Sequence, residues 1–392
     1  MFHITRISTQ IVSKTTFRSS KNVPNQQLFC SQVKSNFNEE VIHLPASMPT
    51  LNDSAQPLHI VTPLLKSNSM TKMLSSSSFP RNIYLKLENV QPSGSFKIRG
   101  IGWTMQEAVR NGSLQFVGSS GGNAGLAMAY AAGKLGKKLT LFVPRTTPAF
   151  MEQKIIDEGA KVFLVGDNWD EANEAALAKV AEDSSNSTFM VHPHNQPTTW
   201  EGHSSLVDEL MLQLSELGEE VPSCIVTAVG GGGLAMGLLQ GMDKHGWHES
   251  VLLGMQTSGA ASFCKSVEQG KLVTLDTVNT KATSLAMRKV IEELFILAKE
   301  QSHRVKCKAV SDMEALDACI RFADDQRLLV EPACGAALAG VYGGGVKEVA
   351  GHGPVVVIVC GGTLPTLIHW GDWKEELELY KCVRNLEFRL LL

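Results

Sequence analysis

The sequence predicts an α/β protein with two lobes, each built on a parallel sheet. From Gln115 onward, short apolar runs rich in β-branched residues alternate with helical segments of ten or more residues. That alternation is typical of a parallel sheet covered by helices on both faces. A second alternating series begins at Trp200 and runs to Val359, and 392 residues suffice for two lobes around one cleft.

The first series predicts four short strands joined by helices. The strands are expected at residues 116–118, 138–143, 161–165 and 188–191, with helices over about 123–135, 148–158 and 170–182. In the second series Leu206, Leu210 and Leu214 mark one face of a helix. Further strands are expected at residues 224–229, 251–255 and 354–359, and further helices at 234–242, 312–327 and 332–342.

Composition excludes several classes of function. The formal net charge is −3, and basic and acidic residues are interleaved, so no nucleic-acid footprint is expected. No apolar run approaches the roughly 18 residues that span a bilayer, so no membrane partner is expected either. The eight cysteines lack CxxC or Cys/His zinc spacing, which favours reduced thiols in an intracellular protein.

Residues 1–45 differ from the rest of the chain. No acidic residue precedes Glu39, whereas Ser, Thr and single basic residues are frequent. This composition is typical of a mitochondrial transit peptide, and equally of a disordered tail that carries no address. The sequence therefore leaves a cytoplasmic and a mitochondrial location open.

One lysine has an unusual setting. Lys97 follows a strand-like run at 82–88 and a turn sequence at 91–94, with Phe96 directly before it. A lysine held there with its amine facing a cavity would have a lowered pKa, through desolvation or nearby cations, as a Schiff-base lysine requires. The alternative is an ordinary solvated lysine.

Two glycine-containing loops each join a predicted strand to a predicted helix. The first, residues 119–125, reads Ser-Ser-Gly-Gly-Asn-Ala-Gly and offers N–H groups to a carboxylate, or else only an N-cap. The second contains four consecutive glycines, 230–233, whose N–H groups would converge on a phosphate. It matches neither a P-loop nor GxGxxG, which disfavours a nucleotide-binding dehydrogenase.

Cys360 closes the last predicted strand. A side chain at the carboxyl end of a parallel strand points toward the usual ligand crevice. Its thiol is therefore a ligand contact, a buried core group or an inert residue that lines the crevice.

Together these motifs resemble the L-serine dehydratase/L-threonine deaminase family of fold-type II pyridoxal 5′-phosphate (PLP) enzymes, in its serine dehydratase-like branch. Residues 93–100, 119–125, 229–234 and 359–362 occur in the family's order, and residues 200–203 and 329–338 also match. The likeness covers roughly residues 59–362. It implies a two-lobed fold similar to the tryptophan synthase β subunit, with the cofactor in the cleft.

The resemblance also implies residue roles. Lys97 would bind PLP as a Schiff base and act as the catalytic base. The substrate carboxylate would be bound by Ser120, Gly121 and Asn123. Further cofactor contacts would come from Phe96, Asn123, Gly230, Gly231, Gly232, Gly233, Leu234 and Cys360. The reaction would be elimination of the β-hydroxyl, giving pyruvate and ammonia from L-serine and 2-oxobutanoate and ammonia from L-threonine.

Domain limits and assembly follow from the same resemblance. A small domain is expected at 91–196, and a large PLP-binding domain at 46–90 and 197–365. Residues 366–392 form a divergent C-terminal tail. A homodimer is expected.

The chain departs from the family pattern at several positions. Gln256 stands where a glutamate is usual, in a monovalent-cation (K⁺) site that would also use Ala260 and Ser262, so weaker cation binding is expected. His194 replaces an aromatic residue near the pocket, either as a titrating group or as polar packing. The segment 279–293, which should cover one face of the cofactor ring, diverges most.

Three hypotheses stay open. The first is an L-serine/L-threonine ammonia-lyase. The second is a serine racemase or another fold-type II PLP enzyme, since Lys97 and both loops serve all of them. The third is a PLP-binding homologue of low activity. Glycine at position 121 is typical of less active members of the branch, so modest turnover is expected.

Overall fold

A computed structural model describes residues 56–75, 81–363 and 367–390. Its larger sheet has six strands in the order β1-β2-β10-β7-β8-β9. All neighbouring pairs are parallel except β1 and β2, which are antiparallel. The strands are β1 Leu64–Lys66, β2 Ile83–Lys86, β7 Cys224–Ala228, β8 Val251–Thr257, β9 Val305–Val310 and β10 Val355–Ile358.

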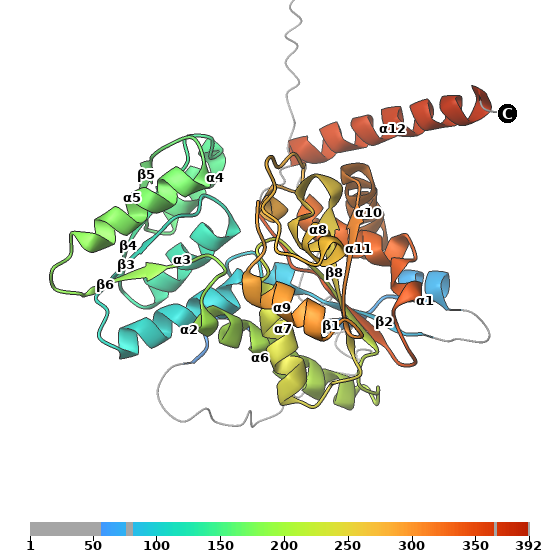
Figure 1. Cartoon of the computed structure of the whole chain (residues 1–392), viewed down its shortest axis with the longest axis horizontal. Helices are drawn as coiled ribbons and strands as arrows, with labels where there is room; N and C mark the ends of the chain where they lie inside the picture. Colours follow the sequence, from blue (N-terminus) through green and yellow to red (C-terminus); the bar gives the residue numbers. More distant parts are fainter. Residues whose placement is uncertain (1–55, 76–80, 364–366, 391–392) are drawn as a thin grey trace, which may run out of the picture. The chain divides into compact units, whose positions relative to one another are not determined.

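The smaller sheet has four strands in the order β5-β4-β3-β6, and every pair is parallel. Figure 1 shows it in cyan and green, with α3, α4 and α5 beside it. Its strands are β3 Gln115–Gly118, β4 Lys138–Val143, β5 Lys161–Leu164 and β6 Thr188–Val191. The predicted α/β fold with parallel sheets is confirmed.

Helices connect the strands in both sheets. Those anticipated from the sequence are α3 Asn123–Lys134, α4 Ala149–Asp157, α5 Trp169–Ala181, α6 Pro197–Glu216, α7 Gly233–Lys244, α10 Asp312–Gln326 and α11 Pro332–Tyr342. Those not anticipated are α1 Asn68–Leu74, α2 Lys97–Arg110, α8 Ser262–Gln269, α9 Glu292–Glu300 and α12 Leu367–Leu390. Short 3₁₀ turns are η1 Glu88–Val90, η2 Ser258–Ala260, η3 Thr283–Leu285 and η4 Gly345–Glu348.

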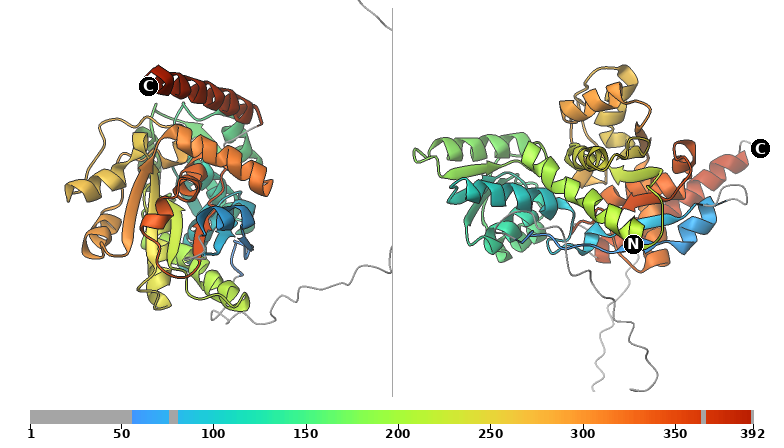
Figure 2. Two further views of the ribbon diagram at one scale, coloured as in Figure 1. Left: turned by 90° about the vertical axis from the view of Figure 1, so that its right-hand side faces the viewer. Right: turned by 90° about the horizontal axis from the view of Figure 1, so that it is seen from below.

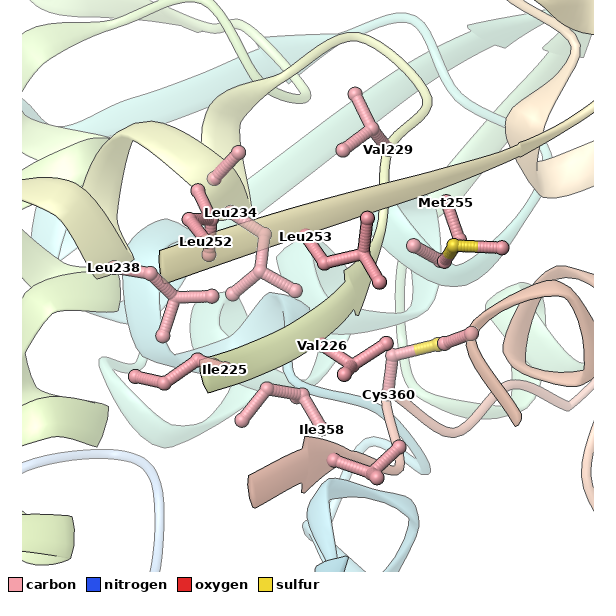
Figure 3. Packing of buried hydrophobic residues seen from close by; sticks show 14 of the residues in the cluster. Ile225, Val226, Val229, Leu234, Leu238, Leu252, Leu253, Met255, Ile358 and Cys360 are labelled. Carbon is pink, nitrogen blue, oxygen red and sulfur yellow. The ribbon is translucent and has the colours of Figure 1, made fainter. Parts of the chain in front are cut away.

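Buried apolar side chains form two clusters, one on each sheet. The cluster on the small sheet lies within residues 98–191, and the other draws on residues 70–87 and 200–360. Figure 3 shows part of the larger cluster, where Val226, Ile358 and Cys360 lie close together. The described residues from 56 onward form one compact unit, so the predicted lobe boundaries stay a prediction.

The C-terminal residues predicted as a divergent tail contain the long helix α12. It lies beside α10 on the outside of the fold (Figures 1 and 2). Ion pairs attach it to the body, from Glu376 to Lys281 and from Lys381 to Asp317. No helix within the described residues is long and apolar enough to cross a membrane. The predicted transit-peptide-like segment, 1–45, lies outside the described residues.

Candidate active site

Lys97 is the first residue of α2 and follows a tight turn. Gly94 has a φ of +78°, a conformation that a residue with a Cβ rarely adopts. The turn is tied to the end of β10, because the Phe96 N–H donates to the Cys360 carbonyl at 3.1 Å and Ser95 bridges to Gly361. The chain thereby brings Lys97 and Cys360 together from positions 263 residues apart.

The Lys97 amine lies in a desolvated setting. Its Nζ donates to the Pro193 carbonyl at 2.8 Å and lies 5.3 Å from the centre of the Phe96 ring. Burial lowers the pKa of Lys97 to about 8, although the nearby Cys360 and Glu331 act to raise it. Desolvation rather than a neighbouring cation therefore makes this amine more nucleophilic near neutral pH.

A cavity of about 310 Å³ lies around this amine. Its walls come from both sheets: the small sheet contributes the loop after β3, and the large sheet contributes the loops after β7 and β10. All residues predicted to contact cofactor or substrate line it, namely Phe96, Lys97, Ser120, Gly121, Asn123, Gly230, Gly231, Gly232, Gly233, Leu234 and Cys360.

The four glycines form a close-fitting turn between β7 and α7. Gly232 has a φ of +102°, and α7 begins at Gly233 with the N–H groups of its first turn free of helical partners. A Cβ at Gly231 would come within 2.3 Å of the His194 ring, and one at Gly233 within 2.6 Å of the His194 carbonyl oxygen. Residues with a side chain therefore do not fit at Gly231 and Gly233. The N–H groups of the first turn of α7, which have no helical partners, suit an anion such as a phosphate.

The loop after β3 leads into α3, whose N-cap is Gly122. Ser120 lines the cavity beside the free N–H groups of this helix end. A Cβ at Gly121 would lie 2.5 Å from Oγ1 of Thr147, so glycine here leaves the Thr147 side chain in place. The arrangement suits a carboxylate.

Asn123 is held in one orientation by groups that sequence reasoning missed. Its Oδ1 accepts hydrogen bonds from the Thr363 N–H at 3.0 Å and from Thr363 Oγ1 at 3.2 Å. Its Nδ2 donates to the Glu331 carboxylate at 3.0 and 3.1 Å and to Ser284 Oγ at 3.2 Å. The amide nitrogen therefore faces Glu331, in the wall of the cavity.

Glu331 is a buried carboxylate, 2% exposed, at the N-cap of α11. Burial raises its pKa to about 7, against the lowering effect of hydrogen bonds from Ser284 and Asn123. The sequence carried a signal for it, because Glu331 is a single acid between the apolar run 328–330 and an apolar helix. A lone charge in such a position is seldom buried without a specific partner.

Cys360 is a buried neutral thiol. A hydrogen bond with Cys334, followed by burial, raises its pKa well above the usual range for a thiol. The thiol therefore presents no negative charge to the cavity at neutral pH.

Two histidines line or adjoin the cavity and are neutral. Nδ1 of His192 accepts the N–H of Asn195 at 2.9 Å and of His194 at 3.3 Å. Burial and then the charge of Lys97 lower the pKa of both rings, that of His192 to about 4. Of the two predicted alternatives for His194, polar packing against the glycine loop agrees with this geometry.

The divergent segment 279–293 lines the cavity despite its sequence. Thr283, Ser284 and Leu285 of η3, together with Met287, contribute to the wall. Ser284 reaches Asn123 as described above. The segment therefore still forms part of the cavity wall, although its residues differ from those usual in the family.

The predicted cation ligands lie elsewhere. Gln256, Ala260 and Ser262 are fully buried and do not line the cavity. Both acceptor directions of Gln256 Oε1 are occupied by the N–H groups of Phe263 and Cys264, each at 3.0 Å. The role of Gln256 as a cation ligand therefore stays a prediction, and the structure shows its oxygen already accepting two hydrogen bonds from the protein.

Comparisons with known proteins agree with this geometry. Residues 55–361 match the family model described as "Pyridoxal-phosphate dependent enzyme". An L-serine dehydratase/L-threonine deaminase from Bos taurus is 43% identical over 331 residues, covering 83% of this chain and 97% of its own length. A Dictyostelium discoideum L-serine dehydratase is 37% identical, covering 83% and 94% of the two chains.

A solved structure is similar as well. The fungal L-serine ammonia-lyase from Rhizomucor miehei has a TM-score of 0.73 and 35% identity. The match covers 82% of this chain and all of the fungal one.

Proposed function

The chain belongs to the pyridoxal-phosphate dependent enzyme family, and from this membership we propose that it is a PLP-dependent ammonia-lyase. It acts on L-serine to give pyruvate and ammonia, and on L-threonine to give 2-oxobutanoate and ammonia. The names of the relatives at about 40% identity support both substrates. The observation that carries the proposal is that one cavity contains both a lysine amine of lowered pKa and the four-glycine loop whose N–H groups suit an anion.

The residues around the cavity fit PLP. A phosphate suits the N–H groups of the Gly230–Gly233 loop and the first turn of α7, where side chains are excluded. An aldehyde suits the Lys97 amine, which is largely unprotonated above about pH 8. The groups that we assign to the cofactor all face one cavity.

When bound, PLP supplies a conjugated ring that stabilises the negative charge left by removal of the substrate's α-proton. Lys97 would hold the cofactor through its Nζ, and the same Nζ, when free, would remove the substrate's α-proton as general base. The lowered pKa of Lys97 increases the fraction of the amine in the basic form that this step requires.

Asn123, Phe96 and Cys360 would orient the cofactor. Asn123, whose amide direction is set by Thr363 and Glu331, would donate from Nδ2 to the ring hydroxyl in place of one of its present hydrogen bonds to Glu331 and Ser284. Phe96 would pack against the ring. Cys360 would meet the ring nitrogen as a neutral thiol, which would favour elimination over transamination because a neutral thiol does not keep that nitrogen protonated as a carboxylate would.

Ser120, Gly121 and Asn123 bind the substrate carboxylate at the N-terminus of α3. The free N–H groups there offer hydrogen bonds, and the helix dipole favours a negative group. This contact orients the substrate so that its α-proton faces the Lys97 amine.

A racemase or another fold-type II activity is the alternative. Three racemases among the solved neighbours are 22–24% identical to this chain, which is a likeness of fold alone. Lys97 and both loops serve such enzymes equally well, so only the products separate the two functions.

Product analysis tests the proposal. The PLP-loaded protein is incubated with L-serine, and pyruvate, ammonia and D-serine are quantified together. We expect pyruvate and ammonia in equal amounts, and 2-oxobutanoate when L-threonine is supplied. D-serine in excess of pyruvate would establish the racemase, and no product from a fully loaded protein would establish a binding protein of low activity.

Three further expectations, on a cation, the oligomeric state and the location, are separate from the proposed reaction. The residues present do not fit the predicted K⁺ site at Gln256, Ala260 and Ser262, so no step is assigned to a cation. The homodimer stays a prediction, which light scattering of the purified protein tests. The choice between cytoplasm and mitochondrion also stays a prediction.

A further inference from the structure

The side chain of Gln256 connects three elements beneath the glycine loop. Gln256 lies in β8 with no solvent exposure. Its Nε2 donates to the carbonyl oxygen of Val229 at 3.0 Å, and Val229 directly precedes Gly230. Its Oε1 accepts the N–H groups of Phe263 and Cys264, both in the first turn of α8.

The orientation of this amide follows from its partners. The Val229 carbonyl is only an acceptor, and the Phe263 and Cys264 N–H groups are only donors. Exchanging the amide oxygen and nitrogen would set two acceptors against each other and leave two buried donors unpaired. The NH₂ group therefore faces Val229.

We propose that the Gln256 amide takes the place of a bound monovalent cation in this chain, so that the glycine loop keeps its shape without an ion. The proposal rests on the assignment of Gly230–Gly233 as the phosphate loop of a PLP enzyme. The amide NH₂ presents the positive end of its dipole to the Val229 carbonyl, where a cation would present its charge. One neutral side chain thus joins the loop to α8.

A glutamate at position 256 would have the same shape as glutamine, but it would need a cation or a proton between its carboxylate and the Val229 carbonyl. One carboxylate oxygen would still accept from the first turn of α8, but the other would lie about 3 Å from the Val229 oxygen with no hydrogen between them. Two acceptors in contact at a fully buried position repel each other strongly, since no water screens them. A cation or a proton between them removes that repulsion.

No other side chain near Gln256 among the described residues supplies the negative charge that a glutamate at this position would bring. Ser262 Oγ is buried and has no partner among the described residues, so it is one oxygen that an ion could use. No group of three or more His, Cys, Asp and Glu side chains in the described part of the chain could hold a metal ion. An ion stripped of water at this position would have no counter-charge, which is strongly unfavourable.

The wild-type protein provides the first test. PLP affinity is measured in KCl, NaCl and tetramethylammonium chloride of equal ionic strength, together with the thermal midpoint of the cofactor-free protein. We expect the PLP dissociation constant to differ less than twofold among the salts, and the midpoint to stay constant. A constant fivefold or more lower in KCl than in tetramethylammonium chloride, or a midpoint that KCl raises, overturns the proposal.

The second test is Gln256→Glu, with Gln269→Glu as the control. Gln269 is exposed at the far end of α8, the helix whose first turn Gln256 contacts, so the control adds the same charge at a solvated position. We expect Gln256→Glu to bind PLP at least tenfold more weakly in tetramethylammonium chloride and to recover in KCl, whereas the control behaves as wild type. A Gln256→Glu protein indifferent to the salt overturns the proposal.

Two further results distinguish a failure of the Gln256 proposal from a failure of the proposed function. If Gln256→Glu does not fold, the wild-type comparison alone decides. If the wild type binds no PLP in any salt, the proposed function fails, and the thermal midpoint of the cofactor-free protein still tests the role of the amide.

Discussion

At the scale of single residues, the site depends on two titratable groups moved in pKa by burial. Lys97 loses its charge more readily than an exposed lysine, and Glu331 keeps its proton longer than an exposed glutamate. Both effects have one cause, because burial disfavours the charged form of either group. Asn123 lies against Glu331 in the wall of the cavity that Lys97 lines.

The pKa of Lys97 predicts how fast PLP attaches to the cofactor-free protein. Only the neutral amine is a nucleophile, so the attachment rate should rise about tenfold per pH unit below pH 8 and level off above it. Stopped-flow absorbance at fixed PLP concentration measures this rate. Lys97→Arg, which keeps the charge without a nucleophile, is the control, and a rate still rising at pH 10 would contradict the account.

Glu331 predicts a pH dependence of stability in the cofactor-free protein. Between pH 4.5, the ordinary pKa, and about 7, the folded protein holds a proton that the unfolded chain has released. The free energy of unfolding therefore falls as pH rises through this window and levels off above it. From pH 5 to pH 8 the wild type should lose about 2–3 kcal/mol relative to Glu331→Gln.

Urea unfolding at the two pH values measures the effect of Glu331. Glu182→Gln, at an exposed carboxylate, is the control and should follow the wild type. Equal pH dependence of the wild type and Glu331→Gln would show that Glu331 is not held protonated by burial.

Gly121 predicts a specific steric effect. In Gly121→Ala the new Cβ meets the Thr147 side chain at 2.5–2.6 Å, so Thr147 must move at the mouth of the proposed carboxylate site. We expect kcat/KM for L-serine to change at least threefold, because positioning of the substrate changes. Unchanged kinetics would remove Gly121 as a cause of modest turnover.

At the scale of elements, a buried ion-pair network holds the start of α2. Arg99, two residues after Lys97, contacts Glu88 of η1 at 2.6 Å and Glu209 of α6 at 2.7 Å. Lys86 of β2 contacts the same Glu209 at 2.6 Å. The network therefore joins four elements next to Lys97.

Removing Arg99 should destabilise the protein strongly. Arg99→Met leaves two carboxylates buried with one basic partner, and breaking such a network costs about 3–5 kcal/mol in the free energy of unfolding. Arg145→Met, which breaks an exposed pair with Asp167, should cost less than about 1 kcal/mol. Denaturant unfolding compares the two variants, and equal losses would contradict a structural role for the network.

Element prediction from the sequence worked where local patterns are strong. The runs at 138–143 and 188–191 are strands as expected, since apolar stretches bounded by turns have few alternatives. β9 was missed because two lysines, Lys306 and Lys308, break the continuous apolar run that marked the other strands, and its pairing with β8 is a long-range contact. α2 was missed because glycines at 100 and 102 interrupt its helical signal, whereas the structure uses Gly100 for contact with His203.

At the scale of the whole molecule, the cavity lies where loops from both sheets meet. Local motifs were sufficient to single out Lys97 and both glycine loops, which line this cavity, because glycine runs and turn residues have a local meaning. The partners of Asn123 were out of reach, since Glu331 is 208 residues away along the chain. The fully paired amide of Gln256 likewise becomes evident only when β8, the glycine loop and α8 are placed together.

The most direct test of the central claim joins the cofactor and the reaction in one experiment. The absorbance spectrum of the PLP-loaded protein is recorded, L-serine is added, and pyruvate is measured for the wild type and for Lys97→Ala. We expect a band near roughly 410 nm and pyruvate formation in the wild type, and neither in Lys97→Ala. A wild-type protein without the band, or with the band and no pyruvate, would contradict the account.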